Sequence, residues 1–252
     1  MIYVCIPSHN EAETIGLVLW KIRKVFEEFP REYQILVGDD GSTDRTPELL
    51  EPYTRVLPLT VIRSEAKRGY ARTVETLLAR ALELTDRPKR DSVVLMHGDF
   101  THGPQYLPDF VKRLDSGADL VVGEATTLTG EASRARRLAR RWASRFLRRG
   151  VRVPGVSDLV SGFVAVRLVV LRHVLKSAGR TLHVEGWSAN AELIGKAARQ
   201  SRRVESVRVE ERYDLRSRAS RVRPWEALRD AWRAGGRIKL PAPQRPSSGA
   251  AA

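Results

Sequence analysis

Short apolar runs alternate with amphipathic helical segments along the first half of this 252-residue chain, and this alternation limits the folds that it can adopt. The runs with strand composition are, in chain order, Ile2–Pro7, Tyr33–Gly38, Leu59–Arg63, Val93–Met96 and Asp119–Gly123. Strands that alternate with helices pair in parallel, because each helix carries the chain back to the same edge of the sheet. The sequence therefore predicts an α/β fold with a mostly parallel sheet flanked by helices.

The segments between these runs carry helix signals. After Glu11, apolar residues recur at spacings of four and three, typical of one helix face, at Ile15, Leu19, Ile22, Phe26 and Phe29. Thr46-Pro47 opens a second helix, since proline is tolerated in the first turn. Tyr70–Leu84 predicts a third helix, and a fourth follows Pro104.

Polar residues follow three of the predicted strands at the point where each strand ends. His9 and Asn10 follow the first strand, Asp39 and Asp40 the second, and Asp99 the fourth. In open α/β sheets ligands bind outside the carboxyl ends of the strands. The sequence therefore predicts a cleft at this edge of the sheet, with the stretch Val93–Pro104 at its centre.

The residue types at these strand ends suit nucleotide binding. Paired carboxylates such as Asp39 and Asp40 can accept hydrogen bonds from a base N–H and from ribose hydroxyls. A separate carboxylate, Asp99, can hold Mg²⁺ or Mn²⁺ against a diphosphate, because these hard cations prefer oxygen ligands. No glycine-rich dinucleotide or P-loop motif occurs at these turns, which argues against those two folds.

Composition bounds the class of protein. Hydrophobic residues make up 42% of the chain, as expected for a globular protein, and Cys5 is the single cysteine, so an internal disulfide is excluded. No apolar stretch approaches the roughly 18 residues of a spanning helix, and no basic segment precedes the first strand. We therefore expect a cytoplasmic protein, soluble or attached to the cytoplasmic face of a membrane.

Charge divides the chain into two unequal halves. Residues 1–130 hold 16 Lys and Arg against 20 Asp and Glu, a net charge of −4, whereas residues 131–252 hold 28 against 10, a net charge of +18. This asymmetry indicates a polyanionic partner for the second half: nucleic acid, an anionic membrane or a phosphorylated lipid.

Two segments of the basic half have amphipathic helical patterns. Ser133–Arg149 carries eight arginines, and its apolar residues gather on one helical side, as they also do in Pro224–Leu240 around Trp225 and Trp232. Two such helices, with aromatic side chains beside dense arginine, favour an interfacial position on anionic lipid. The alternative is that their apolar faces pack on the sheet while the arginines are solvated. The small-residue and proline-rich tail, residues 241–252, is predicted to be disordered.

Three segments together resemble the signatures of family 2 glycosyltransferases with the GT-A fold: Ile6–Gly16, Val37–Thr46 and Leu95–Pro104. Asp158–Arg167 resembles the Ser-Gly-Phe segment of the polyprenol-phosphate sugar transferase branch, which includes dolichol-phosphate mannosyl- and glucosyltransferases. Two later features also resemble that branch: an acidic helix start at residues 190–193, and an Arg-x-x-Gly-x-Ser-Lys loop that Arg212, Ser217 and Arg218 match. The resemblance covers roughly residues 2–235.

This resemblance implies a set of site residues and a divalent cofactor. The residues that it implies for nucleotide-sugar binding are Pro7, His9, Glu11, Asp39, Asp40, Gly98 and Asp99. The residues that it implies for acceptor and phosphate binding are Ser161, Asn190, Glu192, Arg212, Arg216, Ser217 and Arg218. The resemblance gives the catalytic roles to Asp99, as the ligand of Mg²⁺ or Mn²⁺, and to Arg212.

Two departures from the family pattern bear on the site. The family's Asp-x-Asp metal motif reads His97-Gly98-Asp99, so His97 replaces the first carboxylate. His97 either ligates the metal, donates to phosphate or ribose, or is a surface histidine. In the later loop, Leu215 stands for glycine and Arg218 for lysine; a leucine adopts a left-handed turn poorly.

The resemblance implies an inverting transfer of a hexose from a nucleotide-diphosphate sugar to a polyprenyl phosphate. An alternative is transfer to a soluble or glycan hydroxyl, which needs a general base such as Asp158, Glu185 or Glu192. A nucleic-acid-binding protein would explain the basic half but not the acidic cleft. We expect one catalytic domain over residues 1–240, with a nucleotide-sugar half (1–130) and an acceptor- and membrane-facing half (131–240).

Overall fold

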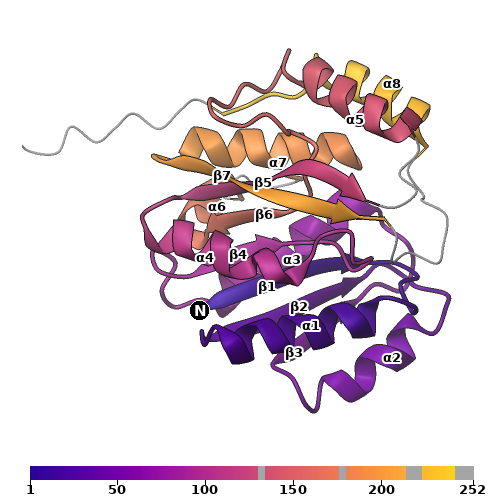
Figure 1. Ribbon diagram of the computed structural model, residues 1–252, viewed down its shortest axis with the longest axis vertical. Coiled ribbons are helices and arrows are strands. Elements are labelled where there is room, and N and C mark those ends of the chain that lie inside the picture. The colour runs from indigo at the N-terminus through magenta and orange to yellow at the C-terminus, as the bar shows by residue number, and fades with distance from the viewer. Residues whose placement is uncertain (130–133, 176–179, 214–222, 242–252) are drawn as a thin grey trace, which may run out of the picture.

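Within the described residues, seven strands form one sheet with the spatial order β3-β2-β1-β4-β6-β5-β7 (Figure 1). The computed structural model describes residues 1–129, 134–175, 180–213 and 223–241. The strands are β1 (Ile2–Ser8), β2 (Tyr33–Asp39), β3 (Leu59–Arg63), β4 (Ser92–Leu95), β5 (Leu120–Thr129), β6 (Val164–Arg167) and β7 (Val204–Arg212). All neighbours pair in parallel except β6, which runs antiparallel to both β4 and β5. The predicted mostly parallel α/β sheet is confirmed.

Helices cover both faces of the sheet, and side chains alternate between the two faces along each strand. On β1, Val4 and Ile6 belong to one core cluster and Cys5 to the other. The first face packs against α1 (Ile15–Glu28), α2 (Thr46–Tyr53) and α4 (Leu107–Asp115). The second packs against α3 (Tyr70–Leu84), α6 (Leu168–Val174) and α7 (Trp187–Gln200).

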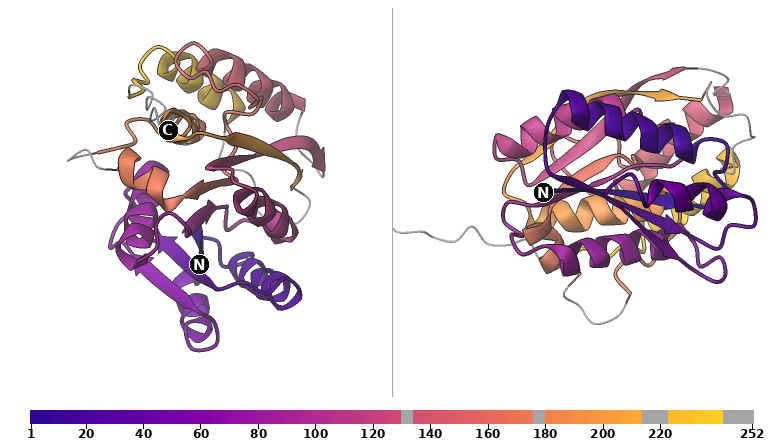
Figure 2. Two further views of the ribbon diagram at one scale, coloured as in Figure 1. Left: turned by 90° about the vertical axis from the view of Figure 1, so that its left-hand side faces the viewer. Right: turned by 90° about the horizontal axis from the view of Figure 1, so that it is seen from below.

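Two further helices, α5 (Arg134–Leu147) and α8 (Pro224–Ala234), lie side by side beyond α7 and form an outer layer (Figures 1 and 2). Their small and apolar residues face the core: Ala143 and Leu147 of α5, and Ala231 and Ala234 of α8, are buried. Amphipathic helices of this kind leave their opposite face to solvent. None of the helices in the described ranges is both long enough and apolar enough to cross a membrane.

The last helix ends at Ala234 instead of continuing to Leu240, and β4 begins and ends one residue earlier than expected. Three further differences from the sequence-based expectation have a physical reason. The first helix begins at Ile15, because residues 11–14 form a turn in which Glu11 donates its N–H to Thr46 Oγ1 at 2.8 Å. β5 continues to Thr129, because β7 pairs with it along its whole length. The antiparallel strand β6 follows the Ser-Gly-Phe segment and was not anticipated, since its four residues are too few to show a period.

Candidate active site

Three parallel neighbours, β1, β2 and β4, end at one edge of the sheet. Ser8 and Asp39 are partners in the register of β1 and β2, and Asp40 donates its backbone N–H to the Ser8 carbonyl oxygen at 2.9 Å. Leu95 of β4 pairs with Cys5 of β1, so the residues after β4 leave the sheet beside those after β1. The polar strand ends identified in the sequence therefore share one edge.

The two aspartates after β2 are buried and order the loops around them. Asp39 Oδ1 accepts the Ser42 N–H at 3.1 Å, and Asp39 Oδ2 lies 3.5 Å from the Nε of Arg63. The Asp40 carboxylate accepts two backbone N–H groups just before α3, those of Arg68 and Gly69, at 2.7 and 2.9 Å. Asp40 thus fixes the loop that leads into α3.

Gly41 makes this arrangement possible. Its φ is +62°, and a Cβ there would lie 2.6 Å from the carbonyl carbon of Ala66 and 2.7 Å from the Lys67 nitrogen. An L side chain is disfavoured in this backbone region, and a Cβ would collide with the facing loop. Glycine therefore lets the chain after Asp40 turn closely against residues 66–67.

The loop after β1 is tied to the loop after β2. Pro7 is half-buried opposite Gly38, His9 is half-buried, and Glu11 is buried. Asp44 accepts the N–H groups of Ala12 and Thr46 at 3.1 and 2.9 Å. Burial alone would raise the pKa of Asp44, but these hydrogen bonds lower it below the ordinary value. The two loops therefore form one ordered wall at this edge of the sheet.

The loop after β4 presents Asp99 beside this wall. Gly98 approaches so closely that a Cβ would lie 3.2 Å from both Ile6 and Ile15, and its carbonyl oxygen accepts Thr14 Oγ1–H at 2.9 Å. Asp99 is 6% exposed, and its Oδ1 accepts the Thr101 N–H at 3.0 Å. The carboxylate is therefore held in one orientation at the strand edge.

His97 packs within a cluster of rings. Its imidazole lies against Gly162, at 4.5 Å from the His102 ring and edge-on to Tyr70 at 5.8 Å between centroids. The His97 backbone N–H donates to His102 Nδ1 at 3.3 Å. His97 is thus enclosed by other side chains rather than being a fully exposed surface residue.

Asp99 suits a divalent cation that is bound partly by the protein and partly by the diphosphate of a nucleotide sugar. Among the described residues, no group of three or more His, Cys, Asp or Glu side chains is arranged to hold an ion. Mg²⁺ and Mn²⁺ are commonly bound by one or two carboxylates together with substrate phosphates, so one ordered aspartate fits this mode. Asp99 would hold the ion, and the diphosphate would supply further oxygens.

Arg212, at the end of β7, lies next to the Asp99 loop. Its backbone N–H donates to the Thr101 carbonyl oxygen at 3.1 Å, and the preceding residue, Glu211, forms an antiparallel bridge with His102. Arg216, Ser217 and Arg218, which the family resemblance also places in phosphate binding, lie outside the described residues, as does the predicted tail from residue 242 onward.

The other predicted acceptor residues are buried and bonded to the protein itself. Ser161 Oγ accepts the Phe163 N–H at 3.2 Å. Asn190 accepts the Tyr70 hydroxyl at 2.8 Å and donates to the Val160 carbonyl oxygen at 3.0 Å. Asn190 therefore links α7 to α3, and both residues stay predictions as acceptor contacts.

Glu192 is buried in a second set of contacts. It lies 2.7 Å from Lys196 Nζ and accepts the His183 N–H at 2.7 Å. Burial alone would raise the pKa of Glu192, but hydrogen bonds from Lys196 and His183 bring it below the ordinary value. Glu192 is ionised and structurally engaged, so its role as an acceptor contact also stays a prediction.

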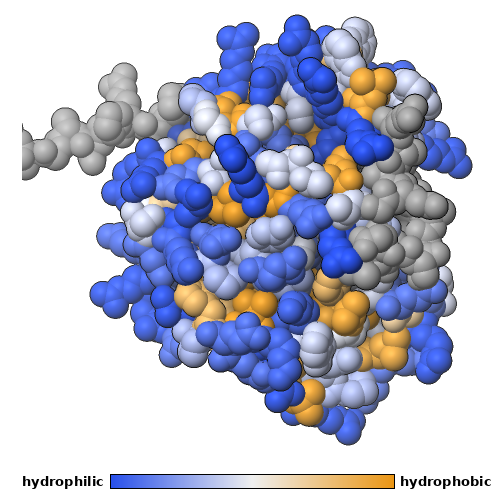
Figure 3. All heavy atoms as spheres, in the orientation of Figure 1, coloured by the Kyte–Doolittle hydropathy of each residue, from blue (hydrophilic) through white to orange (hydrophobic). Residues whose placement is uncertain are grey.

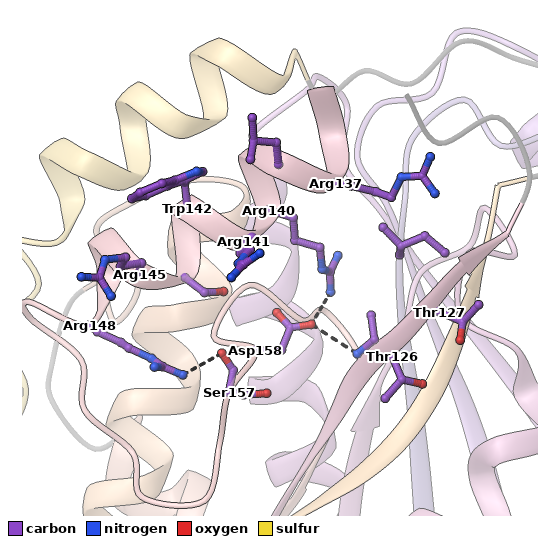
Figure 4. Close-up of a pocket in the computed structure, with 14 residues that line it drawn as sticks. Thr126, Thr127, Arg137, Arg140, Arg141, Trp142, Arg145, Arg148, Ser157 and Asp158 are labelled. Atoms are coloured by element: carbon purple, nitrogen blue, oxygen red, sulfur yellow. Dashed lines mark hydrogen bonds and ion pairs between the residues drawn. The ribbon is translucent and has the colours of Figure 1, made fainter. Parts of the chain in front are cut away.

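An open cavity of about 940 Å³ beside α5 was not predicted from the sequence. We call it the α5 cavity; it lies between α5, the end of β5 and the 157–158 loop (Figure 4). Five arginines line it together with apolar Leu128, Leu138 and Trp142: Arg137, Arg140, Arg141, Arg145 and Arg148. Four of these arginines, all but Arg140, recur at spacings of four, four and three, a signal that could have identified this face of the helix.

Comparisons with known proteins agree with this fold. Residues 3–175 match the sequence model of Glycosyl transferase family 2, which covers more than half of the chain, so the protein belongs to glycosyl transferase family 2. It is 27% identical over 175 residues to a dolichol-phosphate mannosyltransferase from Pyrococcus furiosus, an alignment that covers 68% of this chain and 47% of that protein. The chain spans about half the length of the curated relatives it matches.

Solved structures share the GT-A fold. A mannosyltransferase from Pyrobaculum calidifontis in complex with GDP-Man and Mn²⁺ has a TM-score of 0.60 and 21% identity, covering 95% of this chain and 65% of that one. Glucosyl-3-phosphoglycerate synthase from Mycobacterium tuberculosis, in complex with Mn²⁺, UDP and glucosyl-3-phosphoglycerate, has a TM-score of 0.59 and 20% identity, covering 96% and 81%. At these identities the likeness shows the fold.

Proposed function

We propose that this protein is an inverting, metal-dependent glycosyltransferase that moves a hexose from a nucleotide-diphosphate sugar to a polyprenyl phosphate. The observation that carries the acceptor assignment is the α5 cavity, where five arginines share one lining with Leu128, Leu138 and Trp142. Arginine binds phosphate oxygens through paired N–H donors, and the apolar side chains offer a surface to a hydrocarbon chain. A lipid phosphate uses both parts of this lining, whereas a free sugar uses neither.

The donor half of the proposal rests on the strand-edge carboxylates. Asp39 Oδ2 makes no hydrogen bond within the described residues, and it lies 3.5 Å from the Nε of Arg63, whose side chain is more than half exposed. A base N–H would bond this oxygen after displacing Arg63. Asp40 holds the loop beside it, and Asp99 would hold Mg²⁺ or Mn²⁺ against the diphosphate. When bound, the ion neutralises the charge that grows on the departing nucleoside diphosphate.

The proposed reaction is a single in-line displacement. An oxygen of the acceptor phosphate forms a bond to the anomeric carbon while the bond from that carbon to the nucleoside diphosphate breaks, which inverts the configuration. The phosphate oxygen is already anionic, so no general base is needed. Asp158, Glu185 and Glu192, the carboxylates that could act as a base, each already accept hydrogen bonds from the protein.

Transfer to a soluble acceptor is the second candidate. The solved complex of glucosyl-3-phosphoglycerate synthase contains glucosyl-3-phosphoglycerate, a small phosphorylated product, on the same fold. Both candidates place a phosphate among the arginines, and they differ in whether the acceptor has a hydrocarbon chain. The apolar part of the lining favours the lipid.

We also infer that the protein attaches to the surface of an anionic membrane through α5 and α8. Trp142, Trp225 and Trp232 are 42%, 65% and 54% exposed on these helices. Arginines of both helices are exposed. Hydrophilic side chains project at this end of the molecule (Figure 3). Such a surface suits the cytoplasmic leaflet, where anionic lipids are concentrated.

The acceptor assignment can be tested by transfer from radiolabelled UDP-glucose and GDP-mannose to short-chain polyprenyl phosphate or to phosphoglycerate, with organic extraction of the product. We expect labelled product in the organic phase. The double variant Arg141→Gln/Arg145→Gln should raise the KM for polyprenyl phosphate roughly tenfold or more, because each phosphate–arginine contact is charge-assisted. Arg23→Gln/Arg55→Gln removes the same charge elsewhere and serves as the control. Transfer to phosphoglycerate alone would reject the lipid acceptor.

A further inference from the structure

A buried cluster of charged side chains lies between the α5 cavity and the Asp99 loop. Arg140 Nη1 donates to Glu211 Oε2 at 3.0 Å, and its Nη2 lies 2.8 Å from Glu211 Oε1. The same Nη2 donates to Asp158 Oδ2 at 2.6 Å (Figure 4). The Tyr213 hydroxyl donates to Glu211 Oε2 at 2.8 Å, and His102 Nε2 lies 3.4 Å from Glu211 Oε1. One guanidinium thus joins two carboxylates.

The cluster is buried, and its Arg140–Glu211 pair is ionised. The side chains of Arg140, Glu211 and Asp158 are 11%, 1% and 10% exposed. Burial lowers the pKa of Arg140 and raises that of Glu211, but their attraction outweighs burial. The pKa of Arg140 therefore lies above its ordinary value, and that of Glu211 falls to about 2. Removing one partner of such a pair leaves a buried charge uncompensated, so the partners constrain each other strongly.

The contacts of His102 connect this cluster to the Asp99 loop. His102 Nδ1 accepts the His97 N–H, so the ring proton lies on Nε2, facing Glu211. Thr101, the residue before His102, donates its N–H to Asp99 Oδ1 and accepts the N–H of Arg212 through its carbonyl oxygen. Glu211 therefore precedes Arg212 in the chain and contacts, through His102, the loop that presents Asp99; the family resemblance gives catalytic roles to Arg212 and Asp99.

Arg140 belongs both to the α5 cavity and to the buried cluster. It lines the α5 cavity with four other arginines, and among the described residues it is the one of these five arginines that forms ion pairs within this cluster. We propose that Arg140 is a positioning residue. Through Glu211 and His102 it fixes the position of the Asp99 loop relative to the α5 cavity. This inference rests on the proposed function, because it assigns the cavity to the acceptor and Asp99 to the metal-bound donor.

The geometry requires arginine at this position. A guanidinium has several donors in a fixed planar fork and can meet Glu211 and Asp158 at once, whereas the lysine ammonium is a compact point charge. Arg140→Lys should keep the charge but lose one of the two carboxylate contacts. It should therefore restore function only in part relative to Arg140→Met, which removes the charge and keeps similar bulk.

The test measures Mn²⁺ binding in the presence of UDP or GDP by electron paramagnetic resonance, without any acceptor, and then kcat and acceptor KM. Arg140→Met should weaken Mn²⁺ binding roughly tenfold and lower kcat by a similar factor, since a misplaced site commonly costs this much or more. Arg140→Lys should lie between this variant and the wild type. Arg141→Met, the same change at the next residue of the cavity, should raise the acceptor KM and leave Mn²⁺ affinity at the wild-type value.

A second variant keeps the test decisive if Arg140→Met folds poorly. Arg140→Met/Glu211→Leu/Asp158→Asn replaces all three charges of the cluster with uncharged groups, which often preserves stability. Because His102 then has no carboxylate to bond, we expect a cooperative thermal transition near that of the wild type with Mn²⁺ affinity still reduced. Wild-type Mn²⁺ affinity and kcat in this triple variant would overturn the inference.

The test also separates this inference from the proposed function. A wild-type protein that binds Mn²⁺ with nucleotide but transfers nothing to polyprenyl phosphate defeats the acceptor assignment alone, and the Mn²⁺ affinity of Arg140→Met still decides the positioning role. An Arg140→Met variant that changes only the acceptor KM would make Arg140 an acceptor contact and overturn the inference. A wild-type protein that binds no Mn²⁺ with either nucleotide would overturn it as well.

Discussion

Arg212 donates its backbone N–H to the carbonyl oxygen of Thr101 at 3.1 Å, which joins the end of β7 to the loop that follows β4. These strands are separated in the sheet by β6 and β5, so the contact requires the loop after β4 to extend past both strands. It brings the arginine to the loop that presents Asp99. A diphosphate held by a metal ion at Asp99 would therefore have the cationic residue Arg212 near it.

The first prediction concerns Asp99. Asp99→Asn keeps the shape of the side chain but removes the charge that would hold a divalent cation, so turnover should fall by roughly three orders of magnitude. EDTA should abolish turnover, and Mn²⁺ or Mg²⁺ should restore it. Initial rates of sugar transfer measure both effects. The exposed Asp109→Asn on α4 is the control, and full activity of Asp99→Asn would exclude the metal role.

The second prediction concerns Arg212. If its guanidinium stabilises phosphate oxygens in the transition state, Arg212→Ala should lower kcat/KM by roughly two orders of magnitude, equivalent to about 2.7 kcal/mol. Arg212→Lys should recover part of this loss, because it keeps the charge without the fork of donors. Arg208→Ala, at an exposed position of the same strand, should have kinetics close to the wild type. An equal loss in both alanine variants would point to damage to β7 instead.

The third prediction concerns membrane attachment. Trp225→Ala/Trp232→Ala should weaken co-sedimentation with vesicles of phosphatidylcholine and phosphatidylserine, because both side chains are exposed on α8. Salt should release the wild-type protein, since the screening length falls from about 8 Å at physiological ionic strength to about 3 Å at 1 M. Trp20→Ala removes a comparable side chain, 50% exposed on α1, and should bind as the wild type does. Equal binding to vesicles of phosphatidylcholine alone would contradict an electrostatic contribution to membrane binding.

The fourth prediction concerns the pH dependence of stability. The pKa of Glu211 is lowered from its ordinary value of 4.5 to about 2, where burial acts against the attraction of Arg140 and the hydrogen bonds from His102 and Tyr213. A lowered carboxyl pKa stabilises the folded state above the unfolded-state pKa, and this stabilisation is lost as pH falls toward the folded-state pKa. The free energy of unfolding should therefore decrease between pH 4.5 and about 2.

Glu211→Gln tests this pH dependence in denaturant unfolding. At neutral pH the variant should be less stable by about 3 kcal/mol, as is typical when one partner of a buried pair is removed. The difference from the wild type should shrink as pH falls from 4.5 toward 2, because the wild-type carboxyl then becomes protonated too. Glu48→Gln, at an exposed side chain, is the control. A difference that stays constant over this range would show that Glu211 is not the titrating group.

The sequence by itself determined the elements of the nucleotide-facing half. β3 and α3 have the bounds that were predicted, and the predicted starts of β1 and β2 are also those observed. These features are local: an apolar run or a helical period reports which side of one element faces the core. The polar strand ends at Asp39 and Asp40 were readable for the same reason, because parallel neighbours end at a common edge.

Only the tertiary structure decided how the second half completes the site. Insertion of β6 between β4 and β5 depends on hydrogen bonds between segments some seventy residues apart, and its four residues carry no period of their own. The α5 cavity and the contact of Arg140 with Glu211 likewise join residues from separate elements. Local periodicity identifies a helix face, but its partners are set by packing over the whole chain. The sequence therefore identified α5 as basic, and the fold decided which of its arginines is buried and which line the cavity.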